Sequence, residues 1–231
     1  MRRVFYYARG IPMKRYLFFL ILLLVLSGCS SVYTTEDKAT ENQVKTIDQT
    51  EKKLNIQEDV YVPNPQITDD INLMTVGETV TDAKGELTLK SYKLLNKTVN
   101  IGGVEMVLKD AKLLHFVPDY SMIDFFHSYT HEEEFDFIKV GIEVKNTSDK
   151  DIKFTPVAFV KTNKGELKTW EEDIFLEELT GEIQRNDVKK GNMGFILENT
   201  NDIKSIEILT SDVLDGVGEH VEKAKTIKLD I

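Results

Sequence analysis

Apolar and polar residues alternate along most of the chain after residue 70. The clearest case lies within residues 137–145, where Ile138, Val140, Ile142 and Val144 alternate with polar or small residues. A period of two places the apolar side chains on one face of a β-strand. The pattern recurs in shorter runs at 86–90, 104–109, 152–159, 193–197, 206–208 and 227–231. It therefore predicts a domain made mainly of strands.

Turn-forming residues separate these runs. Gly102-Gly103 lies between two of them, and glycine accepts the positive φ angles that a tight hairpin turn requires. Asn163-Lys164-Gly165 predicts a second hairpin, and residues 146–150 predict a turn between two further strands. Pro156 marks an edge strand or a bulge, because proline cannot donate to a strand ladder. Many short strands joined by turns are typical of a sandwich or a barrel, and we favour a sandwich.

Helix signals are few. Residues 120–134 and 171–179 are candidates for short helices, and residues 51–59 for a brief one. Trp170, the only tryptophan, follows the second predicted hairpin. We expect its large side chain to lie in the core.

The N-terminus has a different pattern. Met13-Lys14-Arg15 precedes an uninterrupted apolar stretch from Tyr16 to Leu26. A helix needs about 20 apolar residues to span a bilayer, so this stretch is too short. A basic start, a short apolar run and small residues are typical of a signal peptide. Because the basic start is complete from Met13 onward, we expect translation to begin there.

The apolar stretch ends in Leu26-Ser27-Gly28-Cys29, which contains the only cysteine of the chain. This arrangement resembles the signal peptide of a bacterial lipoprotein. The resemblance implies cleavage after residue 28 and attachment of a diacylglyceryl group, with acyl chains such as palmitate, to Cys29. Two acyl chains anchor a protein stably, so the protein would be held at the extracytoplasmic face of the cell membrane. The alternatives are an uncleaved membrane anchor and ordinary secretion without lipid.

The composition excludes several kinds of function. The chain has 29 basic and 39 acidic residues, and the signal peptide removes only basic ones. Such an acidic protein lacks the clustered Lys and Arg that bind nucleic acid, and an anionic membrane surface would repel it. Lipidation of Cys29 leaves no thiol for a disulfide, a cysteine-ligated metal or a cysteine nucleophile.

The composition also predicts the domain organisation. The chain after Cys29 is polar up to about residue 70, which is typical of a flexible linker. Forty flexible residues would reach about 35 Å. We therefore predict a signal peptide at 1–28, a lipidated cysteine and flexible linker at 29–70, and a β domain at 71–231.

Four blocks of the predicted domain stand out by their order and spacing. They are Val76–Val80, Phe137–Ile152, Asn163–Glu166 and Val188–Leu197. Together they resemble the immunoglobulin-like domain of unknown function that is common in lipoproteins of Gram-positive bacteria. The resemblance covers about residues 74–209 and implies an immunoglobulin-like β-sandwich without established catalytic residues. This chain departs from that pattern in a long insert at residues 118–136.

Aromatic residues of the insert are candidates for ligand binding. If Tyr120, Phe125, Phe126 and Tyr129 are exposed on a loop, they would form a patch for a partner. In the alternative, Ile123, Phe125 and Phe126 fold back and cap the core.

The insert also contains a candidate metal site. His127 and His131 would share one face of a helix, which suits two metal ligands, and Glu134 would be a third. No glutamate lies between the histidines, where zinc proteases have their catalytic base. The alternative is a polar loop with solvated histidines.

These observations favour a non-enzymatic lipoprotein that binds a protein or cell-wall partner. No motif implies a cofactor or specifies an oligomeric state. The alternative function is a cell-surface hydrolase that uses paired carboxylates or the His127/His131 site. A solute-binding lipoprotein would need two lobes around a cleft, for which the chain is short.

Overall fold

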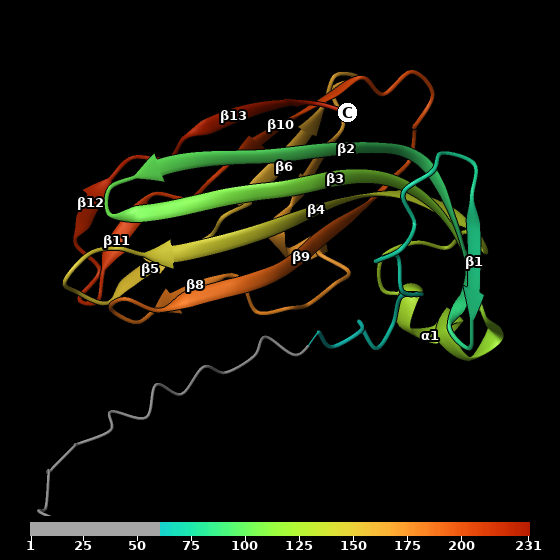
Figure 1. The fold of residues 1–231 in the computed structure, drawn as a ribbon, viewed down its shortest axis with the longest axis horizontal. Coiled ribbons are helices and arrows are strands. Elements are labelled where there is room, and N and C mark those ends of the chain that lie inside the picture. Colours follow the sequence, from blue (N-terminus) through green and yellow to red (C-terminus); the bar gives the residue numbers. More distant parts are fainter. Residues whose placement is uncertain (1–60) are drawn as a thin grey trace, which may run out of the picture. The chain divides into compact units, whose positions relative to one another are not determined.

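The computed structural model describes residues 61–231 of the chain. The signal peptide, Cys29, the candidate helix at 51–59 and most of the predicted linker lie outside the described residues. The described part is mainly β, as the alternation predicts (Figure 1). It contains one short helix, α1 (Ile123–Phe126), and no helix long and apolar enough to cross a bilayer.

The strands form three antiparallel sheets. The long sheet has the order β1-β2-β3-β4-β9, with β1 at Thr79–Asp82, β2 at Gly85–Ile101, β3 at Val104–Pro118, β4 at Phe135–Asn146 and β9 at Val188–Leu197. The second sheet has the order β13-β10-β6-β7, with β13 at Thr226–Asp230, β10 at Ser205–Leu209, β6 at Phe159–Thr162 and β7 at Leu167–Thr169. The third sheet has the order β12-β11-β5-β8, with β12 at His220–Glu222, β11 at Val213–Asp215, β5 at Ile152–Phe154 and β8 at Gly181–Ile183.

One face of the long sheet packs against the other two sheets and forms the inner core (Figure 1). Ile138, Val140, Ile142 and Val144 of β4 all point into this core and are at most 2% exposed. Apolar residues of β3, β5, β6, β10, β11 and β13 meet them there. The period-two prediction is therefore confirmed for β4 and most of the other runs, because these strands bury the face on which their apolar residues lie. Phe159 of β6 is an exception and is 38% exposed.

The predicted turns are also confirmed. Gly102 and Gly103 join β2 to β3 with φ angles of 49° and 88°. Gly165, with a φ of 88°, lies in the turn between β6 and β7. Pro156 lies between β5 and β6, where the chain passes from the third sheet to the second. It therefore separates two strands, which is consistent with its missing N–H.

The opposite face of the long sheet carries a second core at one end. It is built around Phe116, Phe135 and Phe137, together with Leu87, Leu89, Leu114 and Ile196 of the same sheet. Three pieces of chain cover it: the segment of residues 61–74, called the N-terminal segment below, α1, and the loop of residues 173–180. Because both faces of β4 are covered at this end, this strand is buried at nearly every position.

The N-terminal segment corrects the predicted domain boundary at residue 70. Ile67 and Leu73 are 1% exposed in the second core, and Thr68 and Asp70 are also buried. The Thr68 hydroxyl donates to the Gly85 carbonyl oxygen and lies 2.9 Å from it. Residues 61–70 are mostly polar, and their composition alone therefore predicts a flexible linker. They pack nonetheless, because the domain supplies partners for those polar groups.

Both predicted helices are much shorter than expected. Residues 120–134 form a 3-10 turn at Tyr120–Met122, then α1, and then irregular chain. Residues 171–179 contain only the end of a 3-10 turn, Trp170–Glu172, and an irregular loop. The prediction that Trp170 lies in the core is wrong, because its side chain is 46% exposed. It follows β7, the edge strand of the second sheet, where packing partners are available on one side only.

Candidate binding site

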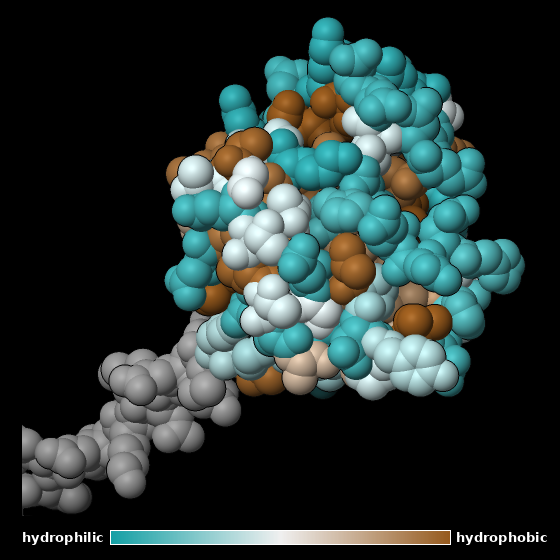
Figure 2. All heavy atoms as spheres, turned by 90° about the vertical axis from the view of Figure 1, so that its right-hand side faces the viewer, coloured by the Kyte–Doolittle hydropathy of each residue, from teal (hydrophilic) through white to brown (hydrophobic). Residues whose placement is uncertain are grey.

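The aromatic residues of the insert mostly cap the second core. Phe126 is 2% exposed, and its ring meets the ring of Phe116 edge-on with 5.5 Å between centroids. Phe125 and Tyr129 pack partly buried against the same core, whereas Tyr120 is 89% exposed. Figure 2 views the end of the domain that carries β1 and α1, and its apolar patches are separated by hydrophilic residues. The four residues therefore do not form the expected exposed binding patch.

The predicted metal site is not assembled. Because α1 ends at Phe126, His127 and His131 do not share a helical face, and their ring centroids are 6.5 Å apart. The Glu134 carboxylate lies 3.8 Å from His115 Nε2 instead. Within residues 61–231, no group of three or more His, Cys, Asp and Glu side chains could hold a metal ion.

His115 has a close carboxylate partner at the base of the insert, as His220 has in Asp212. Its Nδ1 lies 2.8 Å from Asp136 Oδ1, and Asp136 also accepts hydrogen bonds from Lys90 and Thr200. Burial acts to raise the pKa of Asp136, but these three hydrogen bonds hold it below its ordinary value. Asp136 is thus an ionised centre that ties β3, β4 and the chain after β9 together.

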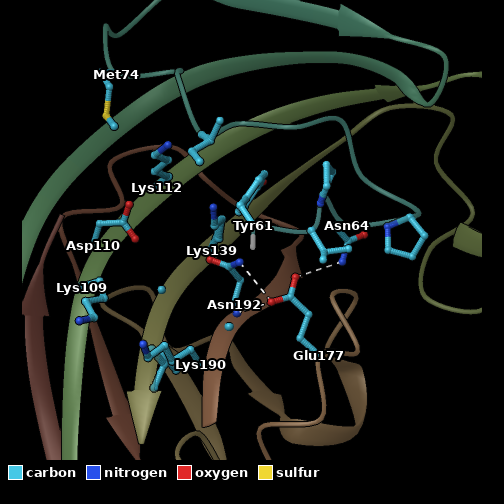
Figure 3. Close-up of a pocket in the computed structure, with 17 residues that line it drawn as sticks. Tyr61, Asn64, Met74, Lys109, Asp110, Lys112, Lys139, Glu177, Lys190 and Asn192 are labelled. Carbon is cyan, nitrogen blue, oxygen red and sulfur yellow. Dashed lines mark hydrogen bonds between the residues drawn. The ribbon is translucent and has the colours of Figure 1, made fainter. Parts of the chain in front are cut away.

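A groove on the outer face of the long sheet is a candidate binding site that the sequence pattern did not indicate. Its volume is about 660 Å³, within the range of small-ligand sites. The N-terminal segment forms one wall, the 173–180 loop contributes Glu177, and β3, β4 and β9 form the floor (Figure 3). The residues that line the groove include Tyr61, Val62, Asn64, Ile71, Met74, Lys109, Asp110, Lys112, Lys139, Gly141, Glu177, Lys190, Gly191 and Asn192.

Two lysines lie side by side on the floor of the groove. Lys112 of β3 and Lys139 of β4 are direct cross-strand partners, and both are buried, at 2% and 7% exposure. Like charges directly opposite each other in a sheet are destabilising. This pair therefore requires a counter-ion that the two strands themselves do not provide.

Asp70 of the N-terminal segment is that counter-ion. Its Oδ2 accepts from Lys112 Nζ at 2.8 Å, and its Oδ1 and Oδ2 lie 2.6 and 2.7 Å from Lys139 Nζ. Lys112 Nζ also donates to the Asp70 carbonyl oxygen at 2.7 Å. Burial acts to raise the pKa of Asp70, but the charges of Lys139 and Lys112 lower it below its ordinary value. Asp70 is therefore ionised at neutral pH, and the buried cluster has two positive charges and one negative charge.

A second set of contacts fastens the end of the groove. Glu177 Oε2 accepts from the backbone and side-chain nitrogens of Asn192 at 2.7 and 3.2 Å, and Glu177 Oε1 accepts from Asn64 Nδ2 at 3.3 Å (Figure 3). Gly191 makes room for this carboxylate, because a Cβ there would lie 2.6 Å from Glu177 Oε2. The hydrogen bonds connect the N-terminal segment, the 173–180 loop and β9.

Asp110 is the groove carboxylate without a partner among the described residues. It is half-buried on β3, opposite Gly141 of β4. A Cβ on Gly141 would lie 2.5 Å from Asp110 Oδ1, so the glycine leaves space for the carboxylate above the sheet. No hydrogen bond or ion pair to the Asp110 side chain is present within residues 61–231. Its oxygens are therefore available to a ligand.

Comparisons with known proteins add the N-terminal assignment and a relative. Residues 13–30 match the prokaryotic membrane lipoprotein lipid attachment site, which supports lipid anchoring of the chain to the membrane. The uncharacterized protein YdhF of Bacillus subtilis strain 168 is 44% identical, and the match covers 94% of this chain and 99% of YdhF.

Two solved structures have a weaker similarity. A functionally unknown protein from Listeria monocytogenes EGD-e is 13% identical over 64% of this chain and 87% of its own, with a TM-score of 0.46. A conserved hypothetical protein from Bacillus anthracis is 14% identical over 62% of this chain and 100% of its own, with a TM-score of 0.34.

Proposed function

The chain belongs to the family of the Bacillus subtilis protein YdhF, and we propose that it is a non-enzymatic, lipid-anchored binding protein. The lipid on Cys29 holds it at the extracytoplasmic face of the cell membrane. Its β domain, an immunoglobulin-like sandwich in this proposal, binds a protein or cell-wall partner in the groove. The two-layer antiparallel arrangement and the lipid attachment site support these assignments.

The composition of the groove carries this proposal. The N-terminal segment exposes large apolar side chains along it: Tyr61 is 50% exposed, Val62 76%, Ile71 45% and Met74 50%. Charged and amide groups of β3, β4 and β9 form the floor below them. Ligand sites typically combine apolar walls with a few polar groups that fix orientation.

The contacts of the groove favour binding over hydrolysis. Glu177 accepts hydrogen bonds from Asn192 and Asn64, and Asp70 is enclosed between two lysines. Carboxylates held in this way position the walls of the groove. A general acid or base must instead be free to exchange protons with a substrate, so these two carboxylates are poorly suited to that role.

Site-specific photo-cross-linking in intact cells tests the proposal. A photo-reactive amino acid at Met74, on the wall of the groove, should form a discrete adduct with a protein or a cell-wall fragment. The matched control is Val217, which is 83% exposed in the turn between β11 and β12. Equal adducts from both positions, or adducts with membrane lipid alone, would count against a binding role for the groove.

A further inference from the structure

The groove contains two charges that the described protein leaves unbalanced. The cluster of Lys112, Lys139 and Asp70 has a net positive charge, and it lies at the floor. The Asp110 carboxylate has no hydrogen-bond donor or ion-pair partner in the described chain. In a partly dehydrated site, a ligand that supplies the opposite charges stabilises such unbalanced charges most strongly.

The other charged groups of the groove have different roles. Lys109 pairs with Glu143, with 2.8 Å between Nζ and Oε2. Glu177 is held by Asn192 and Asn64. Lys190 also has an interaction partner. Among the described groove residues, the unmatched charges are therefore the lysine pair and Asp110.

The register of the sheet places these charged side chains on the same face of neighbouring strands. Asp110 and Lys112 are two residues apart on β3, so their side chains emerge on the same face. Two residues along a strand correspond to about 7 Å. Across the sheet, Asp110 is opposite Gly141 and Lys112 is opposite Lys139, and the Asp110 carboxylate lies over Gly141. The Cα atoms of Asp110 and Lys112 thus lie about 7 Å apart on one surface, and Lys139 lies beside Lys112 on the next strand.

We propose that the groove binds a short peptide-like ligand that has both a free ammonium group and a free carboxylate. The ammonium group binds Asp110, and the carboxylate binds at the lysine pair through Lys139. An apolar side chain of the ligand packs against Ile71 and Met74, which are 45% and 50% exposed. This inference rests on the proposed binding function and specifies the ligand class.

Four dipeptide probes separate the contributions of the two charges. They are leucyl-leucine, its N-acetylated form, its C-terminal amide, and the form that is both acetylated and amidated. All four have the same two apolar side chains and differ only in their charges. Binding is measured by methyl NMR of the full-length lipidated protein in a non-ionic detergent. Ile71 and Met74 are the reporters at the groove, and Met106 in the inner core is the reference.

We expect the zwitterionic dipeptide to bind at least tenfold more tightly than the doubly blocked form, with the singly blocked forms between them. Equal affinity of all four probes, or the absence of shifts at Ile71 and Met74, would overturn the inference. In the second case, a discrete adduct from the Met74 cross-linker would show that the groove still binds a partner of another chemistry.

Two variants assign each charge to its residue. Asp110→Asn should abolish the preference for a free amino group and leave the preference for a free carboxylate. Lys139→Met should do the reverse, and the domain should still fold, because Lys112 and Asp70 remain as a balanced pair. Lys161→Met, in β6 outside the groove, is the matched control. If neither Asp110→Asn nor Lys139→Met changes the order of the four affinities, the assignment is wrong.

Discussion

Asp70 provides the most direct test of how the N-terminal segment is held on the sheet. In Asp70→Asn, two buried lysines that face each other across β3 and β4 lose the only carboxylate that they contact within residues 61–231. Removing one partner of a buried ion pair typically costs about 3–5 kcal/mol, because the remaining charge is left without compensation. For a domain of this size, such a loss lowers the melting temperature by about 10 °C.

The loss should begin locally, at the segment that Asp70 fastens. Hydrogen–deuterium exchange should show faster exchange throughout the N-terminal segment, residues 61–74, while the inner-core strands β4 and β10 keep their relative protection. Circular dichroism during heating gives the melting temperature. Asp69→Asn is the matched control, because the half-buried Asp69 accepts hydrogen bonds from the Tyr61 hydroxyl and the Ile71 backbone N–H and contacts neither lysine among the described residues.

A compensating variant distinguishes charge from packing. Replacing a buried ionic cluster by apolar groups of similar volume is often neutral or stabilising. D70N/K112M/K139M should therefore recover most of the stability that D70N alone loses. The reasoning is refuted if D70N lowers stability by no more than D69N, or if the triple variant is no more stable than D70N.

Three further predictions follow from the remaining features. Burial raises the pKa of Asp173 to about 6, against hydrogen bonds from three backbone amides, so this group stabilises the fold below pH 3.8 and loses that contribution as the pH rises through about 6. Asp173→Asn should remove this pH dependence of the melting temperature, and an unchanged slope between pH 4 and 7 would contradict it. Cys29→Ala should move the protein from the membrane to the soluble fraction without changing its circular dichroism spectrum; a variant that stayed with the membrane would argue against the lipid anchor. Calorimetric titration with zinc should show no site tighter than about micromolar, because the histidine rings at 127 and 131 are 6.5 Å apart without a third ligand, and tighter binding would revive the metal site.

The strands and hairpins could be predicted because their signals are local. Ile138, Val140, Ile142 and Val144 need only the period of a strand to share one face. Gly102 and Gly103 need only their freedom to adopt positive φ angles, which the β2–β3 turn uses. The lipid attachment site is also local, because it lies in one continuous stretch at residues 13–30.

The helices and the insert were harder to predict because their conformation depends on distant partners. Apolar residues at 123, 125 and 126 fit either a helix face or a loop that folds onto a core. The second core decides between them, because it offers Phe116 and Phe135 as aromatic partners for Phe126. For Trp170 the error has the opposite direction: a large apolar side chain predicts burial, but Trp170 is exposed. It follows the edge strand β7, where neighbouring residues pack on one side only.

The sequence by itself determined that this is an acidic, mainly β lipoprotein with a single cysteine for its anchor. It did not reveal the groove, because Lys112 and Lys139 occupy positions that a strand with one buried face would expose to solvent. Asp70, within a polar stretch that resembles a linker, contacts both of them across 42 and 69 residues of sequence. Only the tertiary structure brings these three charges together and places Asp110 beside them, since cross-strand register and the path of the N-terminal segment depend on the whole sheet.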